Sequence, residues 1–115
     1  MITTATIELN GVKYPFRFGM RFQRNFMNHF DIDLISDYQK KIGLLEKMNT
    51  QKAFDALGVF IISAVNAAAK EPVELDVDDV LDAVLNDNTI IETMVAAFVQ
   101  SQPKQTQKAV GKPKK

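Results

Sequence analysis

Few side chains in this sequence could perform catalysis, and the only histidine among its 115 residues is His29. Histidine is the usual general acid or base near neutral pH, and it works beside a nucleophile or a carboxylate. His29 stands next to Phe30 in a short amphipathic run, which favours a structural histidine at or near the surface. The sequence contains no Gly-x-Ser-x-Gly, P-loop or His-Glu-x-x-His pattern. We therefore expect no enzyme, no catalytic residue and no cofactor.

Three aspartates, Asp31, Asp33 and Asp37, have a spacing that faintly resembles a calcium loop. An EF-hand loop also needs glycine at its sixth position and glutamate at its twelfth. Ser36 and Ile42 stand at those two places. The sequence has no cysteine, which removes disulfides and thiolate zinc sites and fits a reducing compartment. We expect no metal site.

Charge is unevenly distributed along a chain whose formal net charge is zero. The stretch from Glu71 to Asp87 holds seven acids and no base. Such a stretch can cap helices and keep a face solvated, and it can also attract a basic partner, including the protein's own tail. The last fifteen residues hold no acid and five lysines: Lys104, Lys108, Lys112, Lys114 and Lys115. The folded part is therefore acidic and the tail is basic.

Residues 103–115 are expected to be a disordered tail, because Pro103 ends the last helical pattern and bulky apolar side chains are almost missing beyond it. Keeping this end soluble is the simplest role for its lysines. Nucleic-acid binding is a second role, but no aromatic residues are interleaved with the lysines and the rest of the chain is acidic. Such binding should be weak and lost with salt, so we expect no nucleic acid as the main partner.

The element that must organise the fold is the apolar stretch from Ala53 to Lys70. On a helical wheel its apolar residues cover roughly 260°, so other helices should surround it. Phe54 and Phe60 are expected to fill space at one end of this helix. A membrane span is the alternative, but the uninterrupted apolar run is nearer a dozen residues than twenty, so we expect no membrane. The narrow polar sector consists of Asp55, Ser63, Asn66 and Lys70.

A β-hairpin is predicted over about residues 2–18. Alternating apolar residues flank Asn10-Gly11, the strongest two-residue signal for a type I′ turn, in which both residues need positive φ. A lone hairpin is marginal in water, so its apolar face must lie on helices or on another subunit. The turn fixes the register of the expected pairs: Leu9 with Val12, Glu8 with Lys13, Ile7 with Tyr14, Thr6 with Pro15, and Ala5 with Phe16.

Two further helices are predicted between the hairpin and the central helix. Phe22, Phe26 and Phe30 recur at helical spacing in a short helix over about residues 20–30. Asp33 is expected to cap a second helix that runs to Met48. Asn49 or Thr50 should then cap the central helix.

The acidic stretch and the residues after it predict two more helices. Asp76 should cap a helix that ends near Leu85, and Thr89 with Glu92 should form a capping box that opens the last helix. The fold class is therefore mainly α. We expect a single domain over residues 1–102, in which the N-terminal hairpin packs on a bundle of four to five helices.

The last predicted helix is apolar over roughly 200° of its wheel, which is wider than the stripe that one contact buries. One interpretation is that this helix is wedged between two others. The other is that it binds a copy of the same chain or a partner helix, and this predicts a homo-oligomer, such as a ring or an open helical array. The candidate protein-binding and oligomerisation residues are Ile90, Met94, Phe98 and Val99.

The run IELNGVKYPFRFGM, Ile7 to Met20, is followed by four or five predicted helices and a Lys-rich end. This combination resembles the tail assembly chaperones of long-tailed bacteriophages. The resemblance implies a non-enzymatic protein that binds the long helical tape measure protein, keeps it soluble and helps to recruit tail tube subunits. In many such phages a frameshift late in the gene adds a second domain, and the codons for the tail would permit one.

Two other functions remain open. One is a small nucleic-acid-associated regulatory protein that uses the basic tail and the cluster Lys13, Arg17, Arg21 and Arg24. The other is a structural phage component, such as a tail completion or tube protein. The first ten residues have neither a basic nor an apolar region of the kind that secretory signals need. We therefore expect a cytoplasmic protein, located in the host cytoplasm if a phage encodes it.

Overall fold

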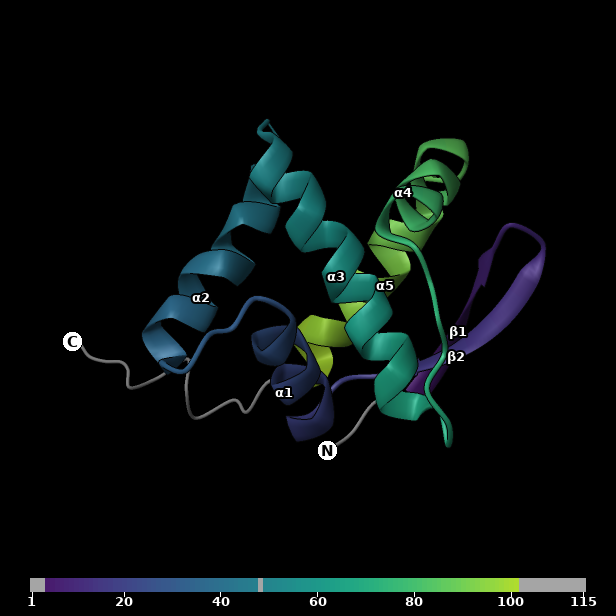
Figure 1. The fold of residues 1–115 in the computed structure, drawn as a ribbon. Helices are drawn as coiled ribbons and strands as arrows, with labels where there is room; N and C mark the ends of the chain where they lie inside the picture. Colours follow the sequence, from purple (N-terminus) through teal and green to yellow (C-terminus); the bar gives the residue numbers. More distant parts are fainter. Residues whose placement is uncertain (1–3, 48, 102–115) are drawn as a thin grey trace.

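The computed structural model describes residues 4–47 and 49–101, and it confirms the predicted fold class (Figure 1). A two-stranded hairpin precedes five α-helices, with α3 in the middle of the helical part. The lysines of the predicted tail, Lys104, Lys108, Lys112, Lys114 and Lys115, lie outside the described residues. The elements are β1 (Thr4–Leu9), β2 (Val12–Arg17), α1 (Met20–His29), α2 (Ile35–Gly43), the 3₁₀ turn η1 (Leu44–Glu46), α3 (Gln51–Ala68), α4 (Val77–Asn86) and α5 (Thr89–Ser101).

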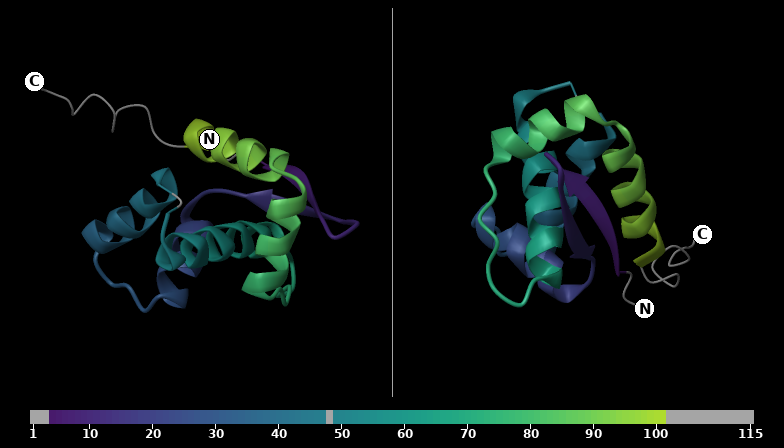
Figure 2. Two further views of the ribbon diagram at one scale, coloured as in Figure 1. Left: turned by 90° about the horizontal axis from the view of Figure 1, so that it is seen from above. Right: turned by 90° about the vertical axis from the view of Figure 1, so that its right-hand side faces the viewer.

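The hairpin has the predicted register, from Leu9 opposite Val12 to Ala5 opposite Phe16. Asn10 and Gly11 have φ angles of 53° and 86°, the positive values that a type I′ turn requires at both positions. Figure 2 shows the hairpin between two helices: β2 packs against α3, and β1 packs against α5. This arrangement buries Ile7, Leu9 and Phe16, which confirms that the apolar side of the hairpin lies on helices.

Helix α3 is the most buried element, as its apolar wheel predicts. Eleven of its residues are buried, including Ser63, which the sequence placed in the polar sector. The prediction for Phe54 is wrong: its side chain is 43% exposed rather than filling space in the core. A helical wheel predicts the width of the apolar stripe, but Phe54 lines an open hollow next to Leu81 and Leu85 and is not covered by them. None of the helices that the structure describes has both the length and the hydropathy needed to cross a bilayer.

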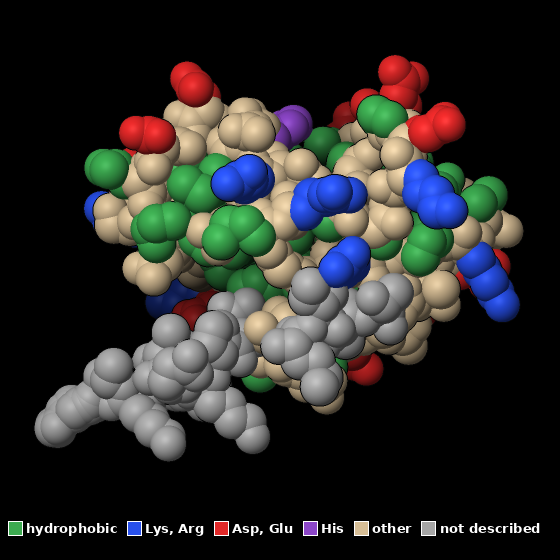
Figure 3. All heavy atoms as spheres, turned by 90° about the horizontal axis from the view of Figure 1, so that it is seen from below, with side chains coloured by type: hydrophobic (Ala, Val, Ile, Leu, Met, Phe, Trp, Pro, Cys, Tyr) green, Lys and Arg blue, Asp and Glu red, His purple; other side chains and the backbone are tan. Residues whose placement is uncertain are grey.

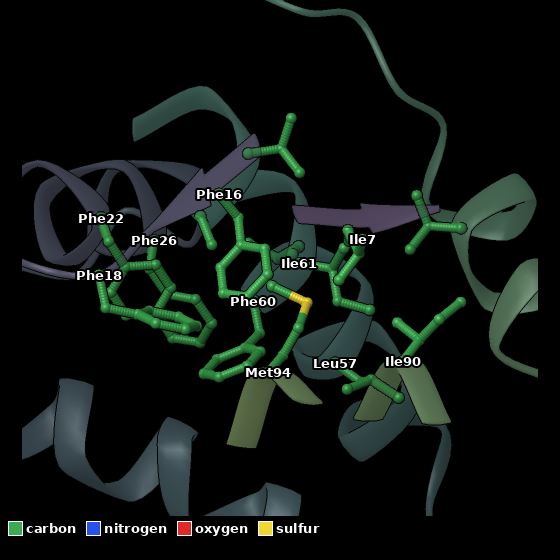
Figure 4. Packing of buried hydrophobic residues seen from close by; sticks show 14 of the residues in the cluster. Ile7, Phe16, Phe18, Phe22, Phe26, Leu57, Phe60, Ile61, Ile90 and Met94 are labelled. Carbon is green, nitrogen blue, oxygen red and sulfur yellow. The ribbon is translucent and has the colours of Figure 1, made fainter. Parts of the chain in front are cut away.

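A cluster of phenylalanine rings joins four elements near the centre of the core (Figure 4). The Phe18 ring lies 4.8 Å from Phe22, 5.1 Å from Phe60 and 5.3 Å from Phe98, measured between ring centroids. Most of these contacts are edge-to-face, the geometry that the ring quadrupole favours. The cluster thereby connects the end of the hairpin with α1, α3 and α5.

Two of the predicted helix starts are confirmed. Thr50 is the N-cap of α3, and its hydroxyl accepts a hydrogen bond from the Ala53 N–H at 3.1 Å. Asp76 caps α4, because its Oδ2 accepts from the N–H groups of Asp78 and Asp79. Both caps satisfy donors that the first helical turn leaves free.

Two other predicted caps are wrong. Leu34 and not Asp33 stands at the N-cap of α2, which ends at Gly43 in a 3₁₀ turn instead of continuing to Met48. At the start of α5, the hydroxyl of Thr89 donates to Asp87 Oδ1, which also accepts from the Thr89 N–H. The Thr89 hydroxyl therefore pairs with Asp87, and Thr89 is the first residue of α5 and not its cap.

Candidate functional site

An open apolar hollow lies between α3, α4 and the start of α5, and we call it the α3–α4 groove. Its volume is about 460 Å³. Leu57 and Val84 are buried and form its floor, Leu81 and Ile91 are half-buried, and Phe54 and Leu85 stand out at its edge. The lining residues are Gln51, Phe54, Asp55, Leu57, Asp78, Leu81, Val84, Leu85, Asn88 and Ile91.

The groove exists because α4 crosses over the first half of α3 (Figure 2). Asp76 starts α4 at a defined point, and Gly58 lets the two helices approach each other closely. A Cβ atom at Gly58 would lie 2.6 Å from Cγ1 of Val77, a distance that side chains do not tolerate. The short connection at 87–88 then turns the chain into α5, which brings Ile91 to the end of the groove.

Leu85 is the most exposed large apolar side chain that the structure describes, at 78%. It lies on α4, whose other exposed residues include Asp78, Asp79 and Asp82. Together with Phe54 it adds apolar surface beside a hollow that is itself apolar. Scattered single apolar residues need no explanation, but a cluster around one hollow is typical of a binding site.

A second apolar feature continues from the groove along the outside of α5. Ile91, Val95 and Val99 follow one another at a spacing of four residues and therefore share one side of the helix. Ile91 is half-buried and lines the groove, while Val95 and Val99 are exposed. We call these three residues the α5 ridge.

The four binding residues predicted on the last helix do not share one surface. Ile90 and Met94 are buried in the core, with exposed fractions of 3% and 1%, so they cannot form a surface contact in this fold. Phe98 is half-buried and belongs to the phenylalanine cluster. Only Val99 is exposed, at 55%. The apolar residues of α5 thus lie on two sides of the helix: Ile90 and Met94 face the core, and the other side is the α5 ridge.

Sequence reasoning missed Phe54, Leu85 and Ile91 as surface residues. The wheel of α4 places Leu85 beside the half-buried Leu81, four residues earlier, so its apolar character is indistinguishable from that of the core stripe. One signal could have identified it: α4 is only ten residues long, and Val80, Ala83 and Val84 already supply its buried side.

A more polar hollow of about 540 Å³ lies between α1, the end of α3 and the following loop. His29 and Lys70 line it, and both are exposed. The Asn25 side chain donates to the Ser63 carbonyl oxygen at 3.3 Å and links the two helices beside it. The part of the chain that the structure describes contains no group of three or more His, Asp or Glu side chains placed to hold a metal ion. This hollow therefore contains a structural link between α1 and α3.

Basic side chains gather near α1. Arg17 and Arg21 line one hollow of about 250 Å³, and Arg21 shares the larger polar hollow with Lys70. Figure 3, which views the molecule from below, shows Lys and Arg side chains across this face. The base Lys13 lies opposite the acid Glu8 in the hairpin register, so an opposite charge stands next to Lys13.

Comparisons with protein-family models, with curated proteins and with solved structures find no match for this chain. The phage chaperone resemblance is therefore carried by the hairpin run and the order of the elements alone.

Proposed function

We propose that the protein is a tail assembly chaperone of a long-tailed bacteriophage, which binds and solubilises the tape measure protein and helps to recruit tail tube subunits. The observation that supports this most directly is the α3–α4 groove, with Phe54 and Leu85 exposed at its edge. Tail assembly takes place in the infected cell, which makes the host cytoplasm the proposed location.

An apolar groove between helices is a common receptor for the apolar side of another helix. A volume of about 460 Å³ is of the size that receives a few anchoring side chains and not a whole protein surface. A long helical client would therefore need many copies of the chaperone, each one holding a short segment. The resemblance implies the same relationship between a small chaperone and a very long client.

The α5 ridge supplies a surface for contacts between such copies. Val95 and Val99 remain exposed after the core is complete, and they lie on the side of α5 away from Met94. Pairing of these residues between copies would remove apolar surface from water and line up the grooves of neighbouring chains. We propose homo-oligomerisation through this ridge in place of the larger residue set predicted from the sequence.

Co-expression with the tape measure protein of the same genome tests the chaperone function. The unmodified protein should keep the client in the soluble fraction and should co-purify with it. The Leu85→Gln variant should fail to do so, because the polar amide weakens the apolar edge of the groove. Met20→Gln is the matched control, since Met20 is 63% exposed but belongs to α1. Equal client solubility with and without the protein would contradict the proposal.

A nucleic-acid-associated regulator is the second candidate, and the basic face near Arg17, Arg21 and Lys70 is the observation in its favour. The acidic α4 weighs against it, because like charges repel the phosphate backbone. Gel shifts at low and at physiological salt separate the two candidates. Retention of a DNA or RNA fragment at physiological salt would favour the regulator.

A further inference from the structure

We propose that the segment bound by the α3–α4 groove is an amphipathic helix whose apolar side is flanked by Lys or Arg. This inference rests on the proposed function, because it assumes that the groove receives a partner helix. It adds the charge of that partner, which the resemblance does not specify.

The charged residues of the groove carry one sign. Asp55 and Asp78 are the only charged side chains among its ten lining residues, and both are exposed. They come from different helices, since Asp55 belongs to α3 and Asp78 to α4. A helix that inserts its apolar side between α3 and α4 would therefore pass an acid on each wall.

The residues around the groove add further negative charge. The chain from Glu71 to Asp87, which includes the whole of α4, holds seven acids and no base. Fields of grouped charges add together and raise the local concentration of oppositely charged partners. Lys or Arg next to the apolar side of the bound helix would meet this field, and their long aliphatic stems would also cover the edges of Phe54 and Leu85.

The protein's own tail fits this groove less well than a separate helix does. The tail supplies the right charge with its five lysines, but Ala109 and Val110 are its only aliphatic residues apart from proline. The exposed edge of the groove consists of the larger side chains Phe54 and Leu85. Binding there needs bulky apolar anchors together with the basic charge, which an amphipathic basic helix combines.

The test uses two synthetic peptides of about four helical turns each. Both carry leucine at the i, i+3, i+4 and i+7 positions of one side, and they differ only in the remaining positions, which hold lysine in one peptide and glutamate in the other. Binding to the full-length protein is measured by fluorescence anisotropy at physiological ionic strength, where distant charges are screened. The Leu/Lys peptide should bind at least about fivefold more tightly than the Leu/Glu peptide, as two exposed charge contacts would give.

Three variants locate the site. Leu85→Gln should lower the affinity for the Leu/Lys peptide. The double variant Asp55→Asn/Asp78→Asn should remove most of the preference for the Leu/Lys peptide over the Leu/Glu peptide. The matched control is Asp33→Asn/Asp37→Asn, which changes the net charge equally at exposed positions near α2. It should leave the preference unchanged.

The possible failures are distinguishable. Equal binding of both peptides, still abolished by Leu85→Gln, would overturn the inferred charge and leave the groove as the client site. If Leu85→Gln does not change binding of the Leu/Lys peptide, the peptide binds elsewhere. That result would overturn both the inferred charge of the partner and the groove as the client site. If deletion of residues 103–115 increases peptide affinity about tenfold, the tail occupies the groove and the inference of a separate helix is wrong. If Leu85→Gln instead dissociates a dimer in sedimentation, the occupant is a second copy, and the inference is equally wrong.

Discussion

The side-chain amide of Asn66 makes two hydrogen bonds to the backbone of Val73. Its Oδ1 accepts from the Val73 N–H at 2.7 Å, and its Nδ2 donates to the Val73 carbonyl oxygen at 3.1 Å. Nδ2 donates at the same time to the Ile62 carbonyl oxygen on α3. One side chain thereby fastens the loop after α3 to the helix that precedes it, and this sets where α4 begins.

Replacing Asn66 with alanine should lower the free energy of unfolding by about 2–3 kcal/mol, because partly buried backbone groups of the loop lose their partner. Urea denaturation monitored by circular dichroism measures this. Asn25→Ala is the control, since Asn25 makes a single hydrogen bond to Ser63 and should cost only about 1 kcal/mol. If both variants cost the same small amount, the loop is held by other contacts.

Gly58→Ala should destabilise the fold, although alanine is the better helix former. The added Cβ would meet Val77 at 2.6 Å, and overpacking of this kind costs about 1–3 kcal/mol. The double variant Gly58→Ala/Val77→Ala should recover much of that loss, since it removes the atom that clashes. A double-mutant cycle on thermal unfolding gives the coupling directly. Additive effects would show that α3 and α4 separate easily at this point.

Gly11→Val should destabilise the hairpin by about 1–3 kcal/mol, because a β-branched residue strongly resists the φ of 86° found there. Gly11 has open space where a Cβ would be added, so the effect would come from the backbone and not from a clash. Gly43→Val, also without a nearby atom, is the control at a position that needs no positive φ. A smaller loss at Gly11 than at Gly43 would contradict the type I′ turn.

Stability should fall at alkaline pH because of Tyr38. Burial raises the pKa of this side chain from 10.0 to about 12, so the folded protein holds the phenolic proton more firmly than the unfolded chain does. This contribution to stability is complete below about pH 10 and is lost as the pH rises toward 12. Between pH 9 and pH 11 the protein should lose about 1 kcal/mol more than the Tyr38→Phe variant does. If urea unfolding shows that both proteins lose the same free energy of unfolding over this pH range, Tyr38 ionises as readily in the folded state as in the unfolded chain.

Val99→Glu should reduce self-association without unfolding the chain, because Val99 is exposed on the α5 ridge while the buried side of α5 is untouched. Sedimentation velocity at tens of micromolar compares the two proteins, and the variant should sediment as a smaller species. Met94→Glu is the contrasting variant: it places a charge in the core and should unfold the protein. If the wild-type protein sediments as a monomer, the α5 ridge is not an oligomer contact.

Features set by neighbouring residues could be predicted from the sequence. The register of the hairpin follows from Asn10-Gly11, and the starts of α3 and α4 follow from Thr50 and Asp76. The groove could not be predicted, because it depends on how α4 packs against α3 and on which side of α5 turns inward. A helical wheel gives the width of an apolar stripe but not its rotation, so Ile90 and Val99 looked equivalent.

The phenylalanine cluster also has a consequence for how the protein acquires its structure during synthesis. Phe18 and Phe98 make an edge-to-face contact, yet almost the whole described chain lies between them. The rings of Phe22 and Phe60 complete the same cluster, so none of these contacts is fully covered until α5 has been made. Closing so long a loop delays folding, and the growing chain exposes its aromatic residues in the meantime. A truncated product that stops before Phe98 would leave the rings of Phe18, Phe22 and Phe60 without the contacts that α5 supplies, and such a chain should be cleaved by proteases faster than the complete one.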